Sequence, residues 1–360
     1  MTGFGIDNLA YGVYSVENGP PQVGVRLGED VIEVTAVRPD LFEEGDLSLL
    51  LASGTDVWQQ VRATIRTMVE GGPDPGLVTP VARATMHVPF PVGDYVDFYS
   101  SVHHATNVGK LLRAGTDPLT PNWRHLPIAY HGRASTIVVD GTPIQRPSGQ
   151  RGPGDFGPSR KLDFELEVGF VTGDGPPLGT PIHVEEAEDY IFGLVLINDW
   201  SARDIQAWEY QPLGPFLGKS FATTISPWVV PLTSLETVRI DPPVQEPTPL
   251  PYLLPAGKGI DIDLEVTING TAVSGSNTRH LYWSMSQQLA HATSNGASIR
   301  AGDLFASGTI SGPTPDSLGC LLEITENGRT GDYLIDGDSV VMSSGILGTC
   351  SGTVVGSTPT

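Results

Sequence analysis

The chain has 360 residues and a formal net charge of −21, and this acidic balance argues against nucleic acid or an anionic membrane as its main partner. Its two cysteines, Cys320 and Cys350, form no CxxC pair, so neither a disulfide framework nor a zinc cluster is expected. The sequence has neither a basic, apolar leader nor an apolar run of about 18 residues. We therefore expect a soluble, cytoplasmic protein with no membrane partner.

Residues 1–88 are expected to form a small separate unit. A hydrophobic content of 39% supplies a core, and 43 glycines with 31 prolines predict many turns between short strands. Extended segments are predicted at residues 10–16, 22–27 and 31–34, as in a small β-barrel. A helix is predicted over 55–68, with Thr55 as its N-cap and Gly71 in the segment that ends it.

A second, larger unit is expected over residues 89–360, after the proline-containing segment 88–93. Strands alternate with Gly/Pro turns here and helices are few, so the fold class is mainly β with some α (α+β). A buried strand is predicted at 191–198, and helices are predicted at 201–210 and 282–293.

The segment 162–168 alternates acidic with apolar side chains, which is typical of a β-strand. In a continuous strand, Asp163, Glu165 and Glu167 share one face, and the two glutamates lie about 6.7 Å apart along it. Their repulsion is roughly 0.6 kcal/mol in water and roughly 2.5 kcal/mol at an effective dielectric of 20. A solvated face tolerates the smaller value, whereas a partly buried cleft needs a counter-cation. Taken alone, the pattern favours the solvated face.

Two further carboxylates could join the glutamates. Asp199 ends the predicted buried strand just before a helix, where ligands often bind, although a lone Asp at such a place more often caps the helix. Asp97 lies in a DFYSS segment and is a weaker candidate when it is read alone. Together with Glu165 and Glu167 they would form an all-oxygen site, which suits Ca²⁺, Mg²⁺ or Mn²⁺ better than zinc or copper.

The helix predicted after Asp199 carries Arg203, Gln206 and Tyr210 at positions i, i+3 and i+7, which form one stripe. A cation, an amide and a phenol can bind carboxylate or carbonyl oxygens, although an ordinary solvated face fits the stripe equally well. Lys219 follows in a glycine-flanked loop, where it is either an oxyanion partner or a surface lysine.

Three histidines compete for the role of a general base. His103 and His104 follow Asp97 within a few residues, and His131 lies in a YHGR segment. A catalytic histidine needs an orienting carboxylate, and residue pattern alone does not choose among the three.

Two nucleotide-binding patterns fail on their context. Residues 152–157 match G-x-G-x-x-G, but a proline interrupts them and a predicted strand follows instead of a helix. Residues 214–220 are one residue too short for a P-loop. No nucleotide cofactor is expected.

Read together, seven segments resemble the fumarylacetoacetase family of carbon–carbon bond hydrolases, which end tyrosine breakdown. The segments are residues 97–101 (DFYSS), 104–109 (HATNVG), 130–135 (YHGRAS), 165–167 (ELE), 198–206 (NDWSARDIQ), 212–220 (PLGPFLGKS) and 306–313 (ASGTISGP). They occur in the family's order. The resemblance implies an N-terminal SH3-like barrel over 1–88, a C-terminal mixed β-roll or β-sandwich catalytic domain over 89–360, and a homodimer.

The resemblance also implies residue roles. The implied metal ligands are Asp97, Glu165, Glu167 and Asp199, and Lys219 with Thr223 match a further cation site. His104 matches the general base and Glu323 the carboxylate that orients it, while Arg203, Gln206 and Lys219 match catalytic groups beside the cleaved bond. The implied substrate contacts are Tyr99, Arg113, Tyr130, Gln206, Tyr210 and Thr309. Asp163 falls outside the ligand set and is expected to serve the neighbouring structure.

The resemblance therefore implies hydrolysis of fumarylacetoacetate, a dicarboxylate β-diketone, to fumarate and acetoacetate with a divalent cation. An alternative is a hydrolase or decarboxylase of the same superfamily that acts on acylpyruvates such as fumarylpyruvate. A third hypothesis, a non-catalytic Ca²⁺-binding β-module, is less favoured because metal storage does not require the stripe of Arg203, Gln206 and Tyr210.

Overall fold

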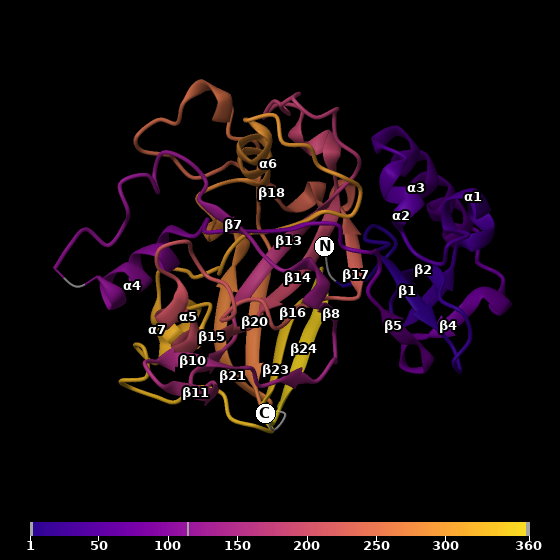
Figure 1. Ribbon diagram of the computed structural model, residues 1–360. Coiled ribbons are helices and arrows are strands. Elements are labelled where there is room, and N and C mark those ends of the chain that lie inside the picture. Colours follow the sequence, from indigo (N-terminus) through magenta and orange to yellow (C-terminus); the bar gives the residue numbers. More distant parts are fainter. Residues whose placement is uncertain (1–2, 114, 358–360) are drawn as a thin grey trace.

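The computed structural model describes residues 3–113 and 115–357, and the chain folds into two β-rich parts with helices around them (Figure 1). The N-terminal strands are β1 (Tyr11–Ser15), β2 (Gln22–Leu27), β3 (Asp30–Glu33), β4 (Val78–Pro80) and β5 (Thr85–His87). They pair antiparallel in the order β4-β3-β2-β1, and β5 also pairs with β1. The helices that accompany this sheet are α1 (Pro39–Phe42), α2 (Ser48–Ala52) and α3 (Thr55–Glu70).

The N-terminal sheet continues into a central sheet, because β1 pairs with β17. The strands of the central part are β6 (Tyr95–Phe98), β7 (Ala129–His131), β8 (Ile137–Val139), β13 (Leu166–Thr172), β14 (Ile191–Asp199), β16 (Thr223–Ile225), β17 (Trp228–Pro231) and β22 (Leu304–Ala306). Their order is β17-β14-β13-β22-β6-β7, and β16 bridges β14 to β8. Strands β13 and β14 are buried along their whole length, since both faces of the sheet are covered there.

A second sheet packs against the central one. Its order is β21 (Thr271–Asn277), β20 (Asp263–Ile268), β23 (Ser339–Ser344), β24 (Gly348–Val355) and β9 (Ile144–Gln145). Inward side chains such as Val266 and Met342 join Leu166 and Leu196 of the central sheet in one hydrophobic core.

Three short pairs and four helices complete the larger part. The pairs are β10 (Ser148–Gly152) with β11 (Asp155–Pro158), β12 (Leu162–Asp163) with β15 (Ser201–Ala202), and β18 (Arg239–Ile240) with β19 (Gly259–Ile260). The helices are α4 (Val102–Leu112), α5 (Arg203–Glu209), α6 (Met285–Thr293) and α7 (Leu321–Ile324). In the part of the chain that the structure describes, no helix has the length and apolar character that a membrane crossing needs.

The predicted α+β class is confirmed, as are the buried strand at β14 and the helix at α3. The small N-terminal unit differs from the predicted barrel, because pairing among its described strands ends at β4 and β5 and the sheet stays open. The N-cap of α3 is Gly54, one residue before the predicted Thr55. Helix α5 starts at Arg203 rather than at Ser201, because Ser201 and Ala202 pair with β12 instead.

The predicted continuous strand 162–168 is wrong in one respect. It is interrupted between β12 and β13, where Glu165 forms an isolated bridge to Cys320. Before the break the chain pairs with β15, and after it the chain pairs with β14 and β22. Asp163 therefore belongs to a different pairing from Glu167, which the alternating pattern could not reveal.

Packing in the hydrophobic core predicts how much stability is lost when the Phe170 side chain is truncated. Phe170 on β13 is 1% exposed, and its ring stacks on Phe305 with the centroids 5.0 Å apart. We expect Phe170→Ala to lower the free energy of unfolding in urea by about 3–5 kcal/mol, because it removes buried apolar surface and leaves a cavity. Phe156→Ala is the control, since that ring is 61% exposed, and it should change stability by less than about 0.5 kcal/mol. Equal effects from the two variants would contradict this account of the core.

Candidate functional site

A pocket of about 800 Å³ opens at the ends of the central strands, between α4, α5 and the loop that precedes β16. Twelve of the side chains predicted for the site line it: Asp97, Tyr99, His104, Arg113, Tyr130, Glu165, Glu167, Arg203, Gln206, Tyr210, Lys219 and Thr309. Of the other three, Asp199 and Glu323 contact lining residues from behind the wall, and Thr223 contacts Asp199. The structure thus brings the whole predicted set to one place.

Four buried carboxylates cluster at the pocket: three of them line it, and Asp199 lies behind them. Asp97, Glu165, Glu167 and Asp199 each place one oxygen within 4.8 Å of the others, and all four are at most 4% exposed. They converge because β6 runs parallel to β22, which pairs with β13, which in turn pairs with β14. The strand pattern alone favoured a solvated face for the two glutamates, and that interpretation is wrong because both are buried.

The carboxylate cluster is short of positive charge. Burial, together with neighbouring carboxylates, raises the pKa of Asp97 and of Glu167 well above the ordinary value. The Oδ1 atom of Asp97 and the Oε1 atom of Glu167 are buried and have no hydrogen-bond partner among the described residues. Unpartnered carboxylate oxygens at this spacing fit a hard divalent cation, which takes oxygen ligands.

Two side-chain cations stabilise the other half of the cluster. The Lys219 ammonium contacts Glu165 Oε2 and Asp199 Oδ2, and Arg203 Nη2 lies 2.7 Å from Glu165 Oε1. Although burial raises the pKa of Glu165, Arg203 and Lys219 outweigh it and hold that pKa below its ordinary value. Thr223 donates a 3.0 Å hydrogen bond to Asp199 Oδ1. A protonated ammonium has no lone pair for a metal, so this arrangement makes Lys219 a counter-charge.

His104 lies beside this cluster and is held by Glu323. His104 Nδ1 is 2.6 Å from Glu323 Oε2, and both side chains are buried. Although burial raises the pKa of Glu323, His104 and the hydrogen bonds to the carboxylate lower it to about 2, so Glu323 stays ionised. An ionised partner favours the tautomer with the proton on Nδ1, which leaves the Nε2 lone pair able to accept a proton.

The structure separates the three candidate histidines. His103 is turned toward His280, with ring centroids 5.7 Å apart. The His131 side chain is 77% exposed and pairs with Asp94 at 3.5 Å. Neither of them lines the pocket, so His104 is the histidine placed to serve as its base.

The predicted stripe on α5 faces the pocket. Arg203 Nη1 donates to Gln206 Oε1 at 3.2 Å, and Tyr210 follows at the end of the helix. The loop that carries Lys219 approaches α5 closely: a Cβ on Gly218 would lie 2.7 Å from the backbone nitrogen of Gln206. Glycine at this position therefore lets Lys219 reach the carboxylates.

Several supporting residues were missed by sequence reasoning. Asn107, one helical turn after His104, donates to Glu323 Oε1 at 2.8 Å, and this i+3 spacing was a usable signal. Ser311 and Cys320 donate to Glu323 Oε2 at 2.7 and 3.3 Å, and their distance in sequence from His104 gave no hint. Two further lining residues, Lys161 and Asn327, belong to segments without a motif.

Asp163 has a structural function, as expected. Its two oxygens accept hydrogen bonds from the backbone N–H groups of Leu321 and Leu322, at 2.7 and 2.9 Å. Its Oδ2 atom also accepts one from Arg203 Nε at 2.8 Å. One buried carboxylate thereby fixes both Arg203 and the start of the helix that carries Glu323.

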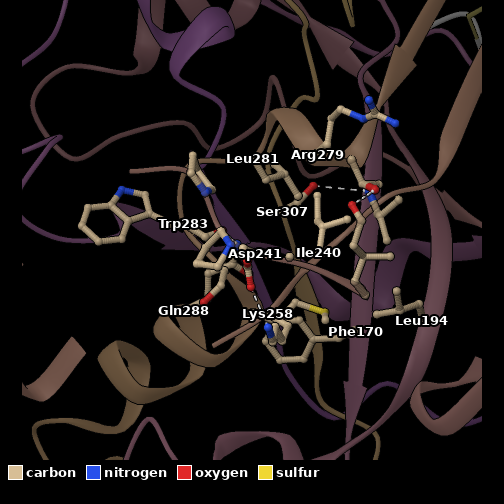
Figure 2. Close-up of a pocket in the computed structure, with 18 residues that line it drawn as sticks. Phe170, Leu194, Ile240, Asp241, Lys258, Arg279, Leu281, Trp283, Gln288 and Ser307 are labelled. Carbon is tan, nitrogen blue, oxygen red and sulfur yellow. Dashed lines mark hydrogen bonds and ion pairs between the residues drawn. The ribbon is translucent and has the colours of Figure 1, made fainter. Parts of the chain in front are cut away.

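A second cavity, of about 40 Å³, lies on the other side of β13 (Figure 2). Val168 and Phe170 line it, and they alternate with Glu167 along the strand, so they point away from the carboxylates. Its polar members include the ion pair of Lys258 with Asp241 at 2.6 Å. It contains no carboxylate cluster and no histidine among the described residues that line it, so the larger pocket is the candidate active site.

Two family models match the chain. The fumarylacetoacetase N-terminal model matches residues 7–89, and the fumarylacetoacetate (FAA) hydrolase C-terminal model matches residues 95–355. Fumarylacetoacetase of Bos taurus is 45% identical over 97% of this chain and 92% of its own length. That of Arabidopsis thaliana is 45% identical over 99% of this chain and 96% of its own length.

Solved structures share the fold at lower identity. A fumarylacetoacetate hydrolase of Exiguobacterium antarcticum superposes with a TM-score of 0.63 at 20% identity, covering 96% of this chain and 99% of its own. A maleylpyruvate hydrolase of Sphingobium sp. SYK-6, in complex with manganese (II) ion and pyruvate, gives a TM-score of 0.61 at 16% identity, covering 97% and 100%. The sequence relatives are 45% identical over nearly the whole chain, and the two family models together match most of it. The chain therefore belongs to the fumarylacetoacetase family.

Proposed function

We propose that this enzyme hydrolyses fumarylacetoacetate to fumarate and acetoacetate. The observation that carries the proposal is a buried four-carboxylate cluster beside the His104–Glu323 pair in one large pocket. The family relationship selects this substrate among the β-diketones that such a site could accept. We further propose that the chain has an N-terminal unit, 1–88, and a catalytic unit, 89–360, and that it forms a homodimer in the cytoplasm.

Asp97, Glu165, Glu167 and Asp199 would hold a divalent cation, for which Ca²⁺, Mg²⁺ and Mn²⁺ are all suited to the oxygen donors. When bound, such an ion would supply Lewis acidity to the substrate's carbonyl groups. Lys219 and Thr223 contact Asp199 and would orient that ligand.

The protein's own groups account for the proton transfers. His104 would take a proton from water at Nε2 while Glu323 stabilises the resulting imidazolium. The hydroxide adds to the carbonyl carbon of the fumaryl group, and Arg203, Gln206 and Lys219 stabilise the developing oxyanion. The carbon–carbon bond then breaks, its electron pair passes to the acetoacetyl carbon, and that carbon accepts the proton that His104 took from water. Tyr99, Arg113, Tyr130, Tyr210 and Thr309 line the pocket and would contact the remainder of the substrate.

The role of His104 is tested by His104→Ala. We expect kcat for fumarylacetoacetate, followed by loss of its absorbance, to fall about 10²- to 10⁴-fold because the general base is lost. His131→Gln is the matched control, since His131 is exposed and outside the pocket, and it should keep wild-type activity. Robust turnover by His104→Ala would exclude His104 as the base.

The cation site is tested without an activity measurement. Saturating Ca²⁺, Mg²⁺ or Mn²⁺ should stabilise the chelator-treated wild type, by about 2.7 kcal/mol at 100 times the dissociation constant. Glu167→Gln replaces one of the four clustered carboxylates by a neutral amide of similar size, so the variant should gain less stability from metal than the wild type does. Glu265→Gln, on the exposed face of β20, should respond as the wild type does. Equal metal stabilisation of Glu167→Gln and wild type would place the cation elsewhere.

The substrate is tested against the runner-up, an acylpyruvate such as fumarylpyruvate. We expect kcat/KM of the metal-loaded wild type to be at least about tenfold higher for fumarylacetoacetate, a difference of about 1.4 kcal/mol in transition-state binding. Activity should vanish with a chelator and return with metal. Faster hydrolysis of fumarylpyruvate would favour the acylpyruvate assignment, and turnover that withstands thorough chelation would contradict a metal-dependent reaction.

A further inference from the structure

The proposed substrate carries two carboxylates, so the pocket needs cations that the protein has not already neutralised. Five cationic side chains line it: Arg113, Arg151, Lys161, Arg203 and Lys219. Three of them are committed to carboxylates of the protein. Arg203 pairs with Asp163 and Glu165, Lys219 with Glu165 and Asp199, and Arg151 with Asp155.

The other two cations have neutral partners. Arg113 donates to the backbone carbonyl of Pro118, and Lys161 Nζ donates to Asn327 at its backbone oxygen (3.2 Å) and at Oδ1 (3.0 Å). Within residues 3–113 and 115–357, neither Arg113 nor Lys161 forms a salt bridge. An ammonium has three N–H groups, so Lys161 retains one donor and its full charge for a ligand.

Lys161 is held in place from two directions. Its backbone oxygen accepts a 2.9 Å hydrogen bond from the N–H of Arg203, the first residue of α5. Its ammonium lies 5.5 Å from the centre of the Tyr333 ring, and the Tyr333 hydroxyl donates to Asn327 Oδ1 at 3.2 Å.

Asn327 is itself positioned by α7, the helix that carries Glu323. It has a φ of 64°, a left-handed conformation that asparagine tolerates, and its N–H donates to the backbone oxygen of Leu322 at 2.8 Å. Leu322 precedes Glu323 in α7. Lys161 thus sits between the helix that carries Arg203 and the helix that carries Glu323, at the wall of the pocket.

We propose that Lys161 binds one of the two substrate carboxylates and that Arg113 binds the other. This inference rests on the proposed function and assigns a second anion-binding residue to the same pocket. It makes the enzyme selective for dicarboxylate β-diketones over analogues that have lost one carboxylate. The asparagine partner suits this role, because it holds the ammonium without cancelling its charge.

The test compares Lys161→Met with the wild type on fumarylacetoacetate and on its two monomethyl esters. We expect KM for the diacid to rise about 10- to 100-fold, since hydrogen bonds to charged groups are the stronger ones, while kcat changes less than about threefold. For one of the two monoesters, wild type and Lys161→Met should have the same KM, because the carboxylate that Lys161 binds is already masked. Lys161→Arg, which keeps the charge, should recover part of the affinity.

Controls separate recognition from a merely structural effect. Lys258→Met removes an ammonium that lies outside the pocket and should leave KM unchanged. For the other monoester, wild type and Arg113→Met should have the same KM, because the carboxylate that Arg113 binds is masked. A Lys161→Met enzyme that is equally impaired on the diacid and both monoesters, or that has an unchanged KM, would overturn the proposal. Turnover of fumarylacetoacetate by the wild type tests the proposed function separately from the role of Lys161. If the wild type prefers another dicarboxylate, the same variants are compared on that compound and on its monomethyl esters.

Discussion

Mutual repulsion among four buried carboxylates is the constraint on which this structure depends. Two unit charges at 4.8 Å repel by about 3–4 kcal/mol at an effective dielectric of 20, and the buried Asp97, Glu165, Glu167 and Asp199 place oxygens within that spacing of one another. Lys219 and Arg203 offset part of this cost on the side of Glu165. Asp97 and Glu167 each keep one buried oxygen without a partner among the described residues, so their repulsion is not offset. A divalent cation would offset it.

The same need for compensation organises the groups around the cluster. Asp163 accepts bonds from Arg203 and from two N–H groups at the start of α7, so the cation that stabilises Glu165 and the helix that bears Glu323 share one anchor. Glu323 is in turn saturated by donors from α4 and from residues 311–320, which keeps it ionised beside His104. Glu165, Asp163 and Glu323 therefore each have a partner of opposite charge or several donors, whereas Arg113 and Lys161 keep neutral partners in the pocket wall.

The rigid framework explains how such a costly arrangement is maintained. The glutamates and Asp199 come from β13, from the residue just before it and from β14, which pair along most of their length and are buried on both faces. Strands held in this way cannot relax apart to relieve the repulsion. Part of the pocket wall comes instead from α5 and the loop before β16, where half-exposed side chains such as Tyr210 have room to adjust.

The expected site residues came from the resemblance carried by motif segments such as residues 198–206, because segments of this length fix which side chains are available and in what order. The sequence by itself also predicted α3 and β14, since hydrophobic periodicity is a local property. The resemblance already implied His104 as the base, and the fold then showed that neither His103 nor His131 lines the pocket. The fold alone showed that the acidic segment breaks at Glu165 and that Ser311 supports Glu323. Those outcomes depend on pairings between residues far apart in the chain, such as Glu165 with Cys320, which no local pattern encodes.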